Sequence, residues 1–159
     1  LMEREVPEIA DGLLESTNCA RITGERAKIS LRALTSNIDP VGAAVGVKGV
    51  RINAVSNELI GENIDCIEHS DVKEILVTRA MSPAAVRSIK IEGDKAIVSI
   101  TSDQKAKAIG KSGINIRLAS MLTGLTIELN EIEGQTMPKT SADEVTKTKD
   151  TTALENLFR

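Results

Sequence analysis

Two short tetrapeptides, each bracketed by glycines, are the residues of this sequence best suited to hold a ligand. Gly46-Val47-Lys48-Gly49 and Gly110-Lys111-Ser112-Gly113 lie 64 residues apart. Glycine has no Cβ and accepts a positive φ, so each loop can turn tightly and a ligand backbone can lie against it. A helix that begins at the second glycine directs unpaired N–H groups and its positive dipole end at the same place. The spacing therefore predicts two phosphate-binding loops.

Polar residues in and beyond the loops favour an anionic ligand. Lys48 and Lys111 lie inside the loops, and the two arginines that follow are either phosphate contacts or solvated helix charges. Asn115 either meets the ligand or stabilises the helix start. The candidate binding residues are Gly46, Val47, Lys48, Gly49, Arg51, Gly110, Lys111, Ser112, Gly113, Asn115 and Arg117.

The enzyme interpretations of the same residues fail on spacing. Gly110-Lys111-Ser112 looks like the end of a nucleotide-binding P-loop, but that motif needs glycine at position 105, which is lysine, and a strand where residues 102–109 look helical. Gly42, Gly46 and Gly49 do not have the GxGxxG spacing of dinucleotide sites. The single histidine, His69, is expected to be a loop or capping residue. We therefore expect no catalytic residues, no metal site and no cofactor.

The elements around the loops occur twice in the same order: helix, strand, strand, helix, GxxG, helix, strand. In the first copy we expect a helix from Pro7 to about Glu15 and a half-buried strand at 27–34, in which Ile29, Leu31 and Ala33 face inward while Lys28, Ser30 and Arg32 face solvent. Helices at 40–45 and from Val50, and a strand at 64–68, complete the copy. The arginines of the hairpin, Arg21, Arg26 and Arg32, are expected to be solvated.

The second copy is predicted to open with a helix capped by Ser70, followed by a turn at Ser82-Pro83 in which proline occupies a first helical position. Strands at 88–92 and 95–101, helices at 102–109 and 114–122, and a strand at 125–130 follow. The fold class is therefore α+β, with two tandem domains at 1–69 and 70–133 packed as one rigid block. Residues 134–159 form a polar tail that we expect to be disordered.

Composition limits the function further. The 159 residues are 41% hydrophobic, yet the only aromatic residue is Phe158, so binding modes that stack bases on aromatic rings are excluded. The net charge is −3, although residues 19–130 carry +3. There is no apolar run long enough to span a membrane and no signal peptide, and Cys19 and Cys66 are typical of buried thiols in a cytoplasmic protein. The start at Leu1 suggests a piece of a longer protein.

With two GxxG loops in identical context, the sequence resembles the KH family in its type II arrangement, over residues 6–132. Longer strings are similar to the NusA family of bacterial transcription elongation and termination factors. These are Glu5-Val6-Pro7-Glu8-Ile9, Arg26-Ala27-Lys28-Ile29, Ile38-Asp39-Pro40-Val41-Gly42-Ala43, the stretch from Gly49 to Leu59, and the stretch from Ala108 to Ser120.

The resemblance implies a binding protein. KH domains grip about four nucleotides of single-stranded RNA between the GxxG loop and an aliphatic groove, without aromatic stacking. By the same resemblance the partners are single-stranded RNA, RNA polymerase and other transcription factors, and the protein acts in transcription elongation, termination and antitermination. We expect a monomer without membrane contact. The alternative is a protein-interaction module with KH folds but little RNA affinity, which the negative net charge permits.

Overall fold

The computed structural model describes residues 1–132, so the predicted tail and Phe158 lie outside the described residues. Each half contains three strands and several short helices. The elements of the first half are α1 (Met2–Glu5), α2 (Pro7–Ala10), β1 (Leu14–Ile22), β2 (Arg26–Ala33), α3 (Pro40–Val45), α4 (Val50–Glu58) and β3 (Asn63–Glu68). Those of the second half are α5 (Lys73–Ala80), β4 (Ser88–Glu92), β5 (Lys95–Thr101), α6 (Lys105–Ile109), α7 (Ile114–Thr123) and β6 (Thr126–Ile132).

The predicted repeat is confirmed by the element order and by the sheets. Sheet A has the order β1-β2-β3, in which β1 and β2 are antiparallel and β2 and β3 are parallel. Sheet B repeats this arrangement with β4-β5-β6. In both halves a helix, the GxxG loop and a second helix connect the two parallel strands, which gives the α+β class predicted.

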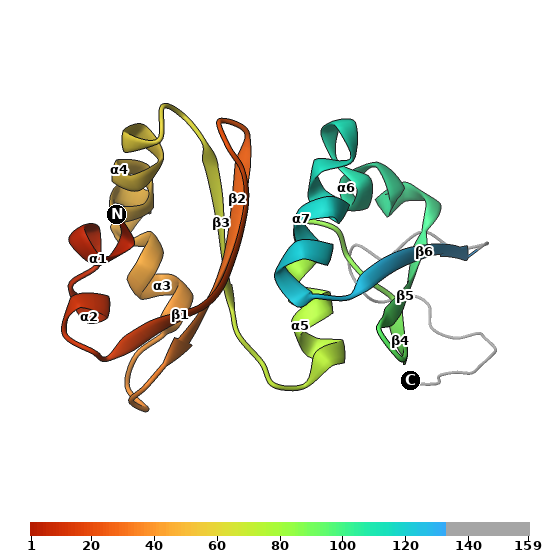
Figure 1. The fold of residues 1–159 in the computed structure, drawn as a ribbon, viewed down its shortest axis with the longest axis horizontal. Helices are drawn as coiled ribbons and strands as arrows, with labels where there is room; N and C mark the ends of the chain where they lie inside the picture. The colour runs from red at the N-terminus through yellow and green to blue at the C-terminus, as the bar shows by residue number, and fades with distance from the viewer. Residues whose placement is uncertain (133–159) are drawn as a thin grey trace, which may run out of the picture.

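The two halves stack as four layers (Figure 1). Helices α1–α4 cover one face of sheet A, α5 and α7 lie between the two sheets, and sheet B forms the opposite outer layer. Alternate residues of a strand point to opposite faces. Among the described residues, sheet A therefore has both faces covered, whereas sheet B packs on helices with only one face.

The hydrophobic cores follow these layers. Val6, Leu14 and Leu31 belong to the first core, between α1–α4 and sheet A. Leu118 and Val98 belong to the second core, around α7. That second core also contains Ala20 and Ile67, which come from sheet A in the first half. The first half therefore supplies one wall of the second core.

This shared wall corrects the prediction that β2 is half-buried. Lys28 and Ser30, expected to face solvent, have 0% of their surface exposed. The reason is tertiary, because α7 packs on β1 and β2 from the side that the alternation assigns to water. A strand covered on both faces no longer needs an exposed polar side.

The predicted opening helix at Pro7 to Glu15 is too long. α2 ends at Ala10, and Gly12 then takes a φ of +76° that no right-handed helix accepts. Leu14 is 1% exposed and pairs with Ala33 across the sheet, so burial and strand pairing outweigh the helical pattern there.

The predicted cap of the second copy is also corrected. The hydroxyl of Ser70 accepts a hydrogen bond from the Val72 N–H at 3.1 Å, which forms a local turn and leaves Val72 extended. α5 therefore begins at Lys73, three residues after the predicted cap. Residues 82–83 form a turn with a cis peptide bond rather than the first turn of a helix. Nowhere between residues 1 and 132 is a helix long and apolar enough to cross a membrane.

Candidate nucleic-acid interface

The two GxxG loops have the same backbone conformation. The first glycines, Gly46 and Gly110, have φ/ψ of 80°/170° and 78°/172°. The third residues, Lys48 and Ser112, have 55°/26° and 56°/26°, a left-handed conformation that is uncommon for residues with a side chain. Two different sequences hold the same strained turn, so the conformation is imposed by the surrounding repeat.

The first glycine of each loop is required by a close contact. A Cβ at Gly46 would stand 2.8 Å from Cγ of Arg51, and one at Gly110 would stand 2.7 Å from Cβ of Asn115. The loop backbone therefore lies directly on the first turn of the helix that follows. A side chain at either position would push the loop away from that helix.

Arg51 holds the first loop to the preceding helices. Its Nη1 donates to the carbonyl oxygen of Ala43 in α3 at 2.8 Å and to Oε1 of Glu8 in α2 at 2.8 Å. The sequence left open whether Arg51 contacts phosphate or is a solvated charge; in the structure its side chain is 31% exposed and ion-paired with Glu8, and the phosphate contact stays a prediction. The guanidinium satisfies a carbonyl near the end of α3 and neutralises a carboxylate.

Asn115 holds the second loop at the equivalent position, five residues after the first glycine. Only 5% of its surface is exposed, and its Nδ2 donates to the carbonyl oxygens of Ala108 at 3.0 Å and Met81 at 3.1 Å. Its Oδ1 is buried and has no partner among residues 1–132. The inward direction of this side chain favours stabilisation of the helix start over contact with a ligand.

Each loop offers free hydrogen-bond donors. Within the described chain, no backbone carbonyl or side chain accepts from the N–H groups of Val47 and Lys48, or from those of Lys111 and Ser112. These groups precede α4 and α7, which have nine and ten residues. Free N–H groups at the positive end of a helix dipole are suited to bind phosphate oxygens.

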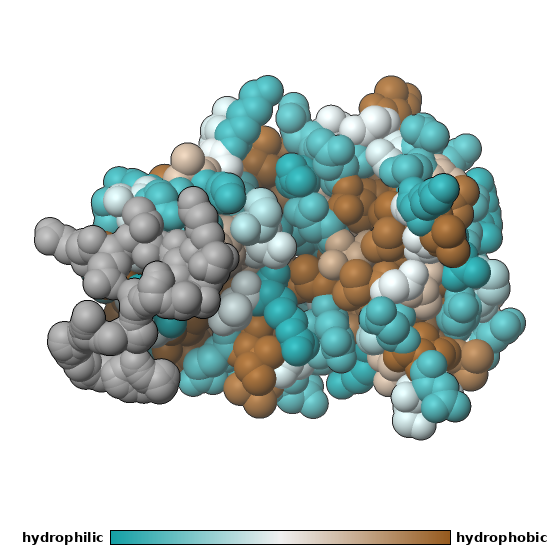
Figure 2. Space-filling model, turned by 180° about the vertical axis from the view of Figure 1, so that it is seen from behind, coloured by the Kyte–Doolittle hydropathy of each residue, from teal (hydrophilic) through white to brown (hydrophobic). Residues whose placement is uncertain are grey.

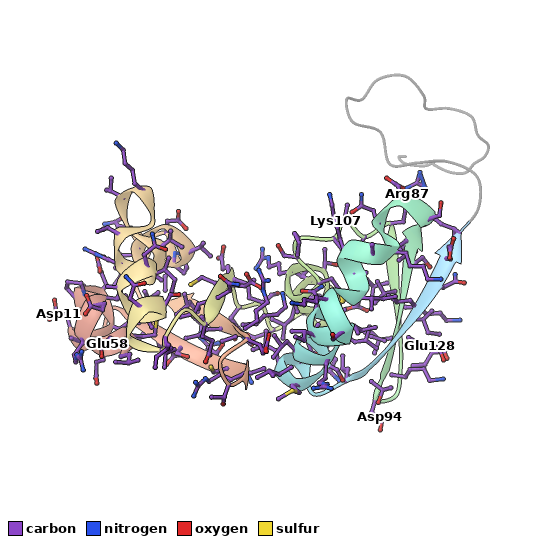
Figure 3. All side chains as sticks on the ribbon, turned by 90° about the horizontal axis from the view of Figure 1, so that it is seen from above. Asp11, Glu58, Arg87, Asp94, Lys107 and Glu128 are labelled. Carbon is purple, nitrogen blue, oxygen red and sulfur yellow. The ribbon has the colours of Figure 1, made fainter. Side chains whose placement is uncertain are left out.

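The cations around the two loops are distributed unequally. Lys48 is the third residue of the first loop, whereas Lys111 is the second residue of the other, so their side chains leave the turn from different positions. Both are exposed, and neither forms an ion pair with a described residue. The second loop is flanked by Lys107 and Arg117, which are likewise exposed and unpaired within residues 1–132. Figure 3 shows Lys107 on α6, at the outside of the molecule.

Apolar side chains accompany the first loop. Val47 is 80% exposed and Val50 is 63% exposed, which is unusual for aliphatic residues in a folded domain. Figure 2 shows hydrophobic residues interspersed with hydrophilic ones on the face seen from behind. These valines place an exposed apolar surface directly beside the free backbone N–H groups of the first loop.

The hairpin arginines Arg21, Arg26 and Arg32 keep 41%, 36% and 44% of their side chains exposed, as the sequence predicts, but each forms an ion pair that the sequence did not predict. Arg21 forms two hydrogen bonds, of 2.8 and 2.7 Å, with the carboxylate of Glu62, whose side chain is 0% exposed. Arg26 binds Asp65 in the same way at 3.0 and 3.2 Å. The strand pattern carries no signal that distinguishes Glu62 and Asp65 from the other acidic residues of the sequence.

Hydrogen bonding shifts the pKa values of both carboxylates. The bonds from Arg21 hold the pKa of Glu62 below its ordinary value. Burial alone would raise the pKa of Asp65, but the hydrogen bonds and charges of Arg26 and Lys28 outweigh it and keep that pKa low. Both groups are therefore ionised partners of structural cations, not acids or bases poised for catalysis.

His69 lies beside one carboxylate, with its Nε2 3.0 Å from Oδ1 of Asp71. Within residues 1–132 there is no group of three or more histidine, cysteine or acidic side chains that could hold a metal ion. The P-loop alternative also lacks its context, because α6 rather than a strand precedes Gly110.

Comparison with known proteins places both halves in one family. Residues 1–69 match the family model of the NusA-like first KH domain, and residues 73–137 match that of the NusA-like second KH domain. A transcription termination/antitermination protein NusA from Helicobacter pylori is 45% identical over 184 residues, covering 100% of this chain and 47% of its own length. The corresponding proteins of Thermus thermophilus and Bacillus subtilis are each 46% identical, covering 84% and 81% of this chain and 35% of their own lengths.

The chain thus spans about half the length, or less, of these curated relatives. A solved crystal structure of a protein called APE1850 superposes with a TM-score of 0.58 at 20% identity, covering 80% of this chain and 96% of that one. At that identity the likeness concerns the fold alone.

Proposed function

Because the chain belongs to the NusA family of transcription termination/antitermination proteins through its two KH domains, we propose that it binds single-stranded RNA with both GxxG loops. The observation that carries the proposal is the repeated loop itself. Each copy holds the same left-handed turn, two free backbone N–H groups and an unpaired lysine. That set of groups is complementary to consecutive phosphates of an extended strand.

The loops and the grooves have different tasks in this proposal. The backbone N–H groups and lysines bind phosphates, which sets affinity but carries no sequence information. Bases would be read by aliphatic side chains such as Val47 and Val50 and by backbone groups beside them. Arg51 and Asn115 bind backbone carbonyls of the helices that precede the loops. We therefore propose that they hold the loops in position and do not contact RNA directly.

In the longer protein, we propose that this RNA is the nascent transcript and that binding occurs beside RNA polymerase in the cytoplasm, with this chain acting as a monomer. The names of the relatives support a role in termination and antitermination. The test is a reconstituted transcription reaction in which the longer protein carries the loop substitutions described next. Loss of its effect on termination, with polymerase binding retained, is the expected result.

The direct test of RNA binding is its salt dependence. On a single strand, each phosphate that the protein neutralises adds about 0.7 to the steepness of the plot of log affinity against log salt. Lys48→Asp combined with Lys111→Asp should therefore make the plot shallower by roughly 1.4 and weaken binding at every salt concentration. The matched control is Lys73→Asp with Lys90→Asp, which changes the net charge equally at exposed lysines outside the loops.

Two outcomes would contradict the proposal. Equal weakening in the loop variant and the control would show that net charge, not the loops, attracts RNA. Absence of RNA binding by the folded wild-type chain would favour the protein-interaction module instead. Selection from randomised RNA adds a second measure, because a consensus longer than about four nucleotides requires both domains.

A further inference from the structure

Lys28 is a fully buried cation that the RNA-binding loops do not use. It lies in the middle of β2, has 0% of its side chain exposed, and places its Nζ 3.1 Å from Oδ2 of Asp65 on the neighbouring strand. The same Nζ donates to the backbone carbonyl of Ser82 at 2.7 Å. Asp65 belongs to the first half and Ser82 to the second, so this ammonium group joins the two halves.

The surroundings of Lys28 are the wall of the second core. Ala20 is the direct neighbour of Lys28 on β1, and Ala20 and Ile67 both belong to the hydrophobic cluster of the second half. Burial lowers the pKa of Lys28, and the charge of Asp65 opposes that shift. An ammonium group in such a place is costly to desolvate.

The repeat shows that the fold does not require a cation at this position. Lys28 pairs with Asp65 in sheet A, and the corresponding pair in sheet B is Ile97 with Glu128. Ile97 is half-buried, and Glu128 projects from β6 on the face of sheet B that no helix of residues 1–132 covers (Figure 3). An aliphatic residue therefore suits the strand, and a well-packed aliphatic side chain in a buried site is often at least as stabilising as an ion pair.

An aliphatic side chain, however, forms no hydrogen bond, and a hydrogen bond has a preferred direction that an apolar contact lacks. The carbonyl that Lys28 binds belongs to Ser82, and the carbonyl of the preceding residue, Met81, accepts from Asn115 at the start of α7. Asn115 is also the residue on which Gly110 of the second loop rests. A short chain of contacts thus runs from sheet A of the first half through the Met81-Ser82 backbone to the second loop.

We infer that Lys28 is a positioning residue that fixes the second GxxG loop relative to the first half, and so sets the spacing at which one RNA strand can occupy both loops. Apolar contacts of the shared core hold the halves together, and at the link between them Arg79 of α5 donates to the carbonyl oxygens of Glu68 and His69 at 3.1 and 3.4 Å. The hydrogen bond from Lys28 lies away from that link, in the middle of β2, and fixes the angle between the halves at a second point. The RNA component of this inference rests on the proposed function, whereas the orientation component does not.

The test replaces Lys28 by methionine, which keeps the volume but removes the donor. The control is Lys90→Met, the same change on the uncovered face of sheet B, where Lys90 pairs with Ile97. Residual dipolar couplings report the relative orientation of the two sheets in solution. Fluorescence anisotropy reports affinity for two pools of random-sequence RNA, of about 5 and about 12 nucleotides, sized to one and to both four-nucleotide sites.

With Lys28→Met we expect the couplings of the two halves to stop fitting one common alignment. Linked sites bind a long strand more tightly than either site alone, and this gain depends on geometry. We therefore expect the ratio of long-pool to short-pool affinity to fall about tenfold or more, with short-pool affinity retained. The control should leave both the couplings and the ratio unchanged.

Unchanged couplings in a folded Lys28→Met variant would overturn the inference. A changed orientation with an unchanged affinity ratio would overturn the spacing role. If the wild-type chain binds neither pool, the proposed function fails, and the couplings alone decide whether Lys28 sets the orientation. If the methionine variant does not fold, Lys28→Met combined with Asp65→Asn, which removes the donor and its partner carboxylate together, takes its place in the same measurements, and couplings that then still fit one alignment would overturn the inference.

Discussion

The equivalent residues Arg51 and Asn115 should differ sharply in what they contribute to stability. Both donate to a carbonyl near the end of the preceding helix, but Asn115 is 5% exposed whereas the Arg51 side chain is 31% exposed. Removal of Asn115 takes one donor from each of two buried carbonyls, so that of Ala108 loses its side-chain bond while that of Met81 keeps only the bond from the Ala84 N–H at 3.0 Å. Removal of Arg51 leaves a carbonyl that water can reach.

The magnitudes follow from those environments. Asn115→Ala removes two hydrogen bonds at about 1 kcal/mol each, and a cavity where the amide was adds about 1 kcal/mol more. The expected decrease in the free energy of unfolding is therefore about 3 kcal/mol, or roughly 12 °C in Tm for a domain pair of this size. Arg51→Ala removes a half-exposed ion pair with Glu8 and one hydrogen bond, for about 1 kcal/mol and roughly 4 °C.

The assay is urea denaturation followed by far-ultraviolet circular dichroism, because the chain has no Trp or Tyr for fluorescence. Asn57→Ala, an exposed asparagine on α4, is the matched control and should change stability by less than about 0.5 kcal/mol. A decrease for Asn115→Ala below about 1 kcal/mol, or an equal decrease for Arg51→Ala, would refute the reasoning that burial of the freed carbonyls decides the difference.

Three further outcomes are expected. Hydrogen bonds from Arg21 keep the folded pKa of Glu62 below its unfolded value of about 4.3, so the stability they contribute is present above that pH and is lost as the pH falls through the folded pKa. Glu62→Gln should therefore flatten the acid limb of a pH–stability curve, and an unchanged limb would contradict the assignment. Burial raises the pKa of Cys66 to about 12, whereas Cys19 is exposed. A thiol reagent at neutral pH should therefore modify Cys19 first and Cys66 only on unfolding. Equal rates of modification would show that β3, which carries Cys66, opens in the folded protein. Gly110→Ala should lower the free energy of unfolding by about 2 to 4 kcal/mol, measured by denaturation. The added Cβ would stand 2.7 Å from Cβ of Asn115, at a φ of +78° that alanine rarely adopts. A decrease below about 1 kcal/mol would show that the loop shifts at little cost.

The GxxG loops and the repeat could be predicted because their signals are local. Glycine at both ends of a tetrapeptide, followed by helical spacing, permits the turn that Gly46 and Gly110 adopt. The order of strands and helices follows from periodicities within about ten residues. Finding the same order twice made the domain type recognisable without any knowledge of its packing.

Two predictions of element boundaries from local signals failed, one because of pairing with a distant strand and one because of a hydrogen bond between residues two positions apart. The helical pattern after Pro7 gave way to strand pairing at Leu14, since that side chain is buried against the first core. The cap expected at Ser70 became a turn because the hydroxyl accepts from Val72 instead of the first turn of a helix. Each error concerns an element boundary that tertiary or very short-range hydrogen bonding decided.

The sequence by itself determined the two GxxG loops, the near absence of aromatic residues and the twofold repeat, because these depend on residue type and spacing alone. Only the tertiary structure decided which polar residues hold the loops in position through hydrogen bonds to neighbouring helices. Arg51 and Asn115 bind carbonyls, and Lys28 is buried between the two halves. Their roles depend on which surface packs on which, and a strand pattern that alternates apolar and polar residues does not record whether its polar face meets water or a second domain.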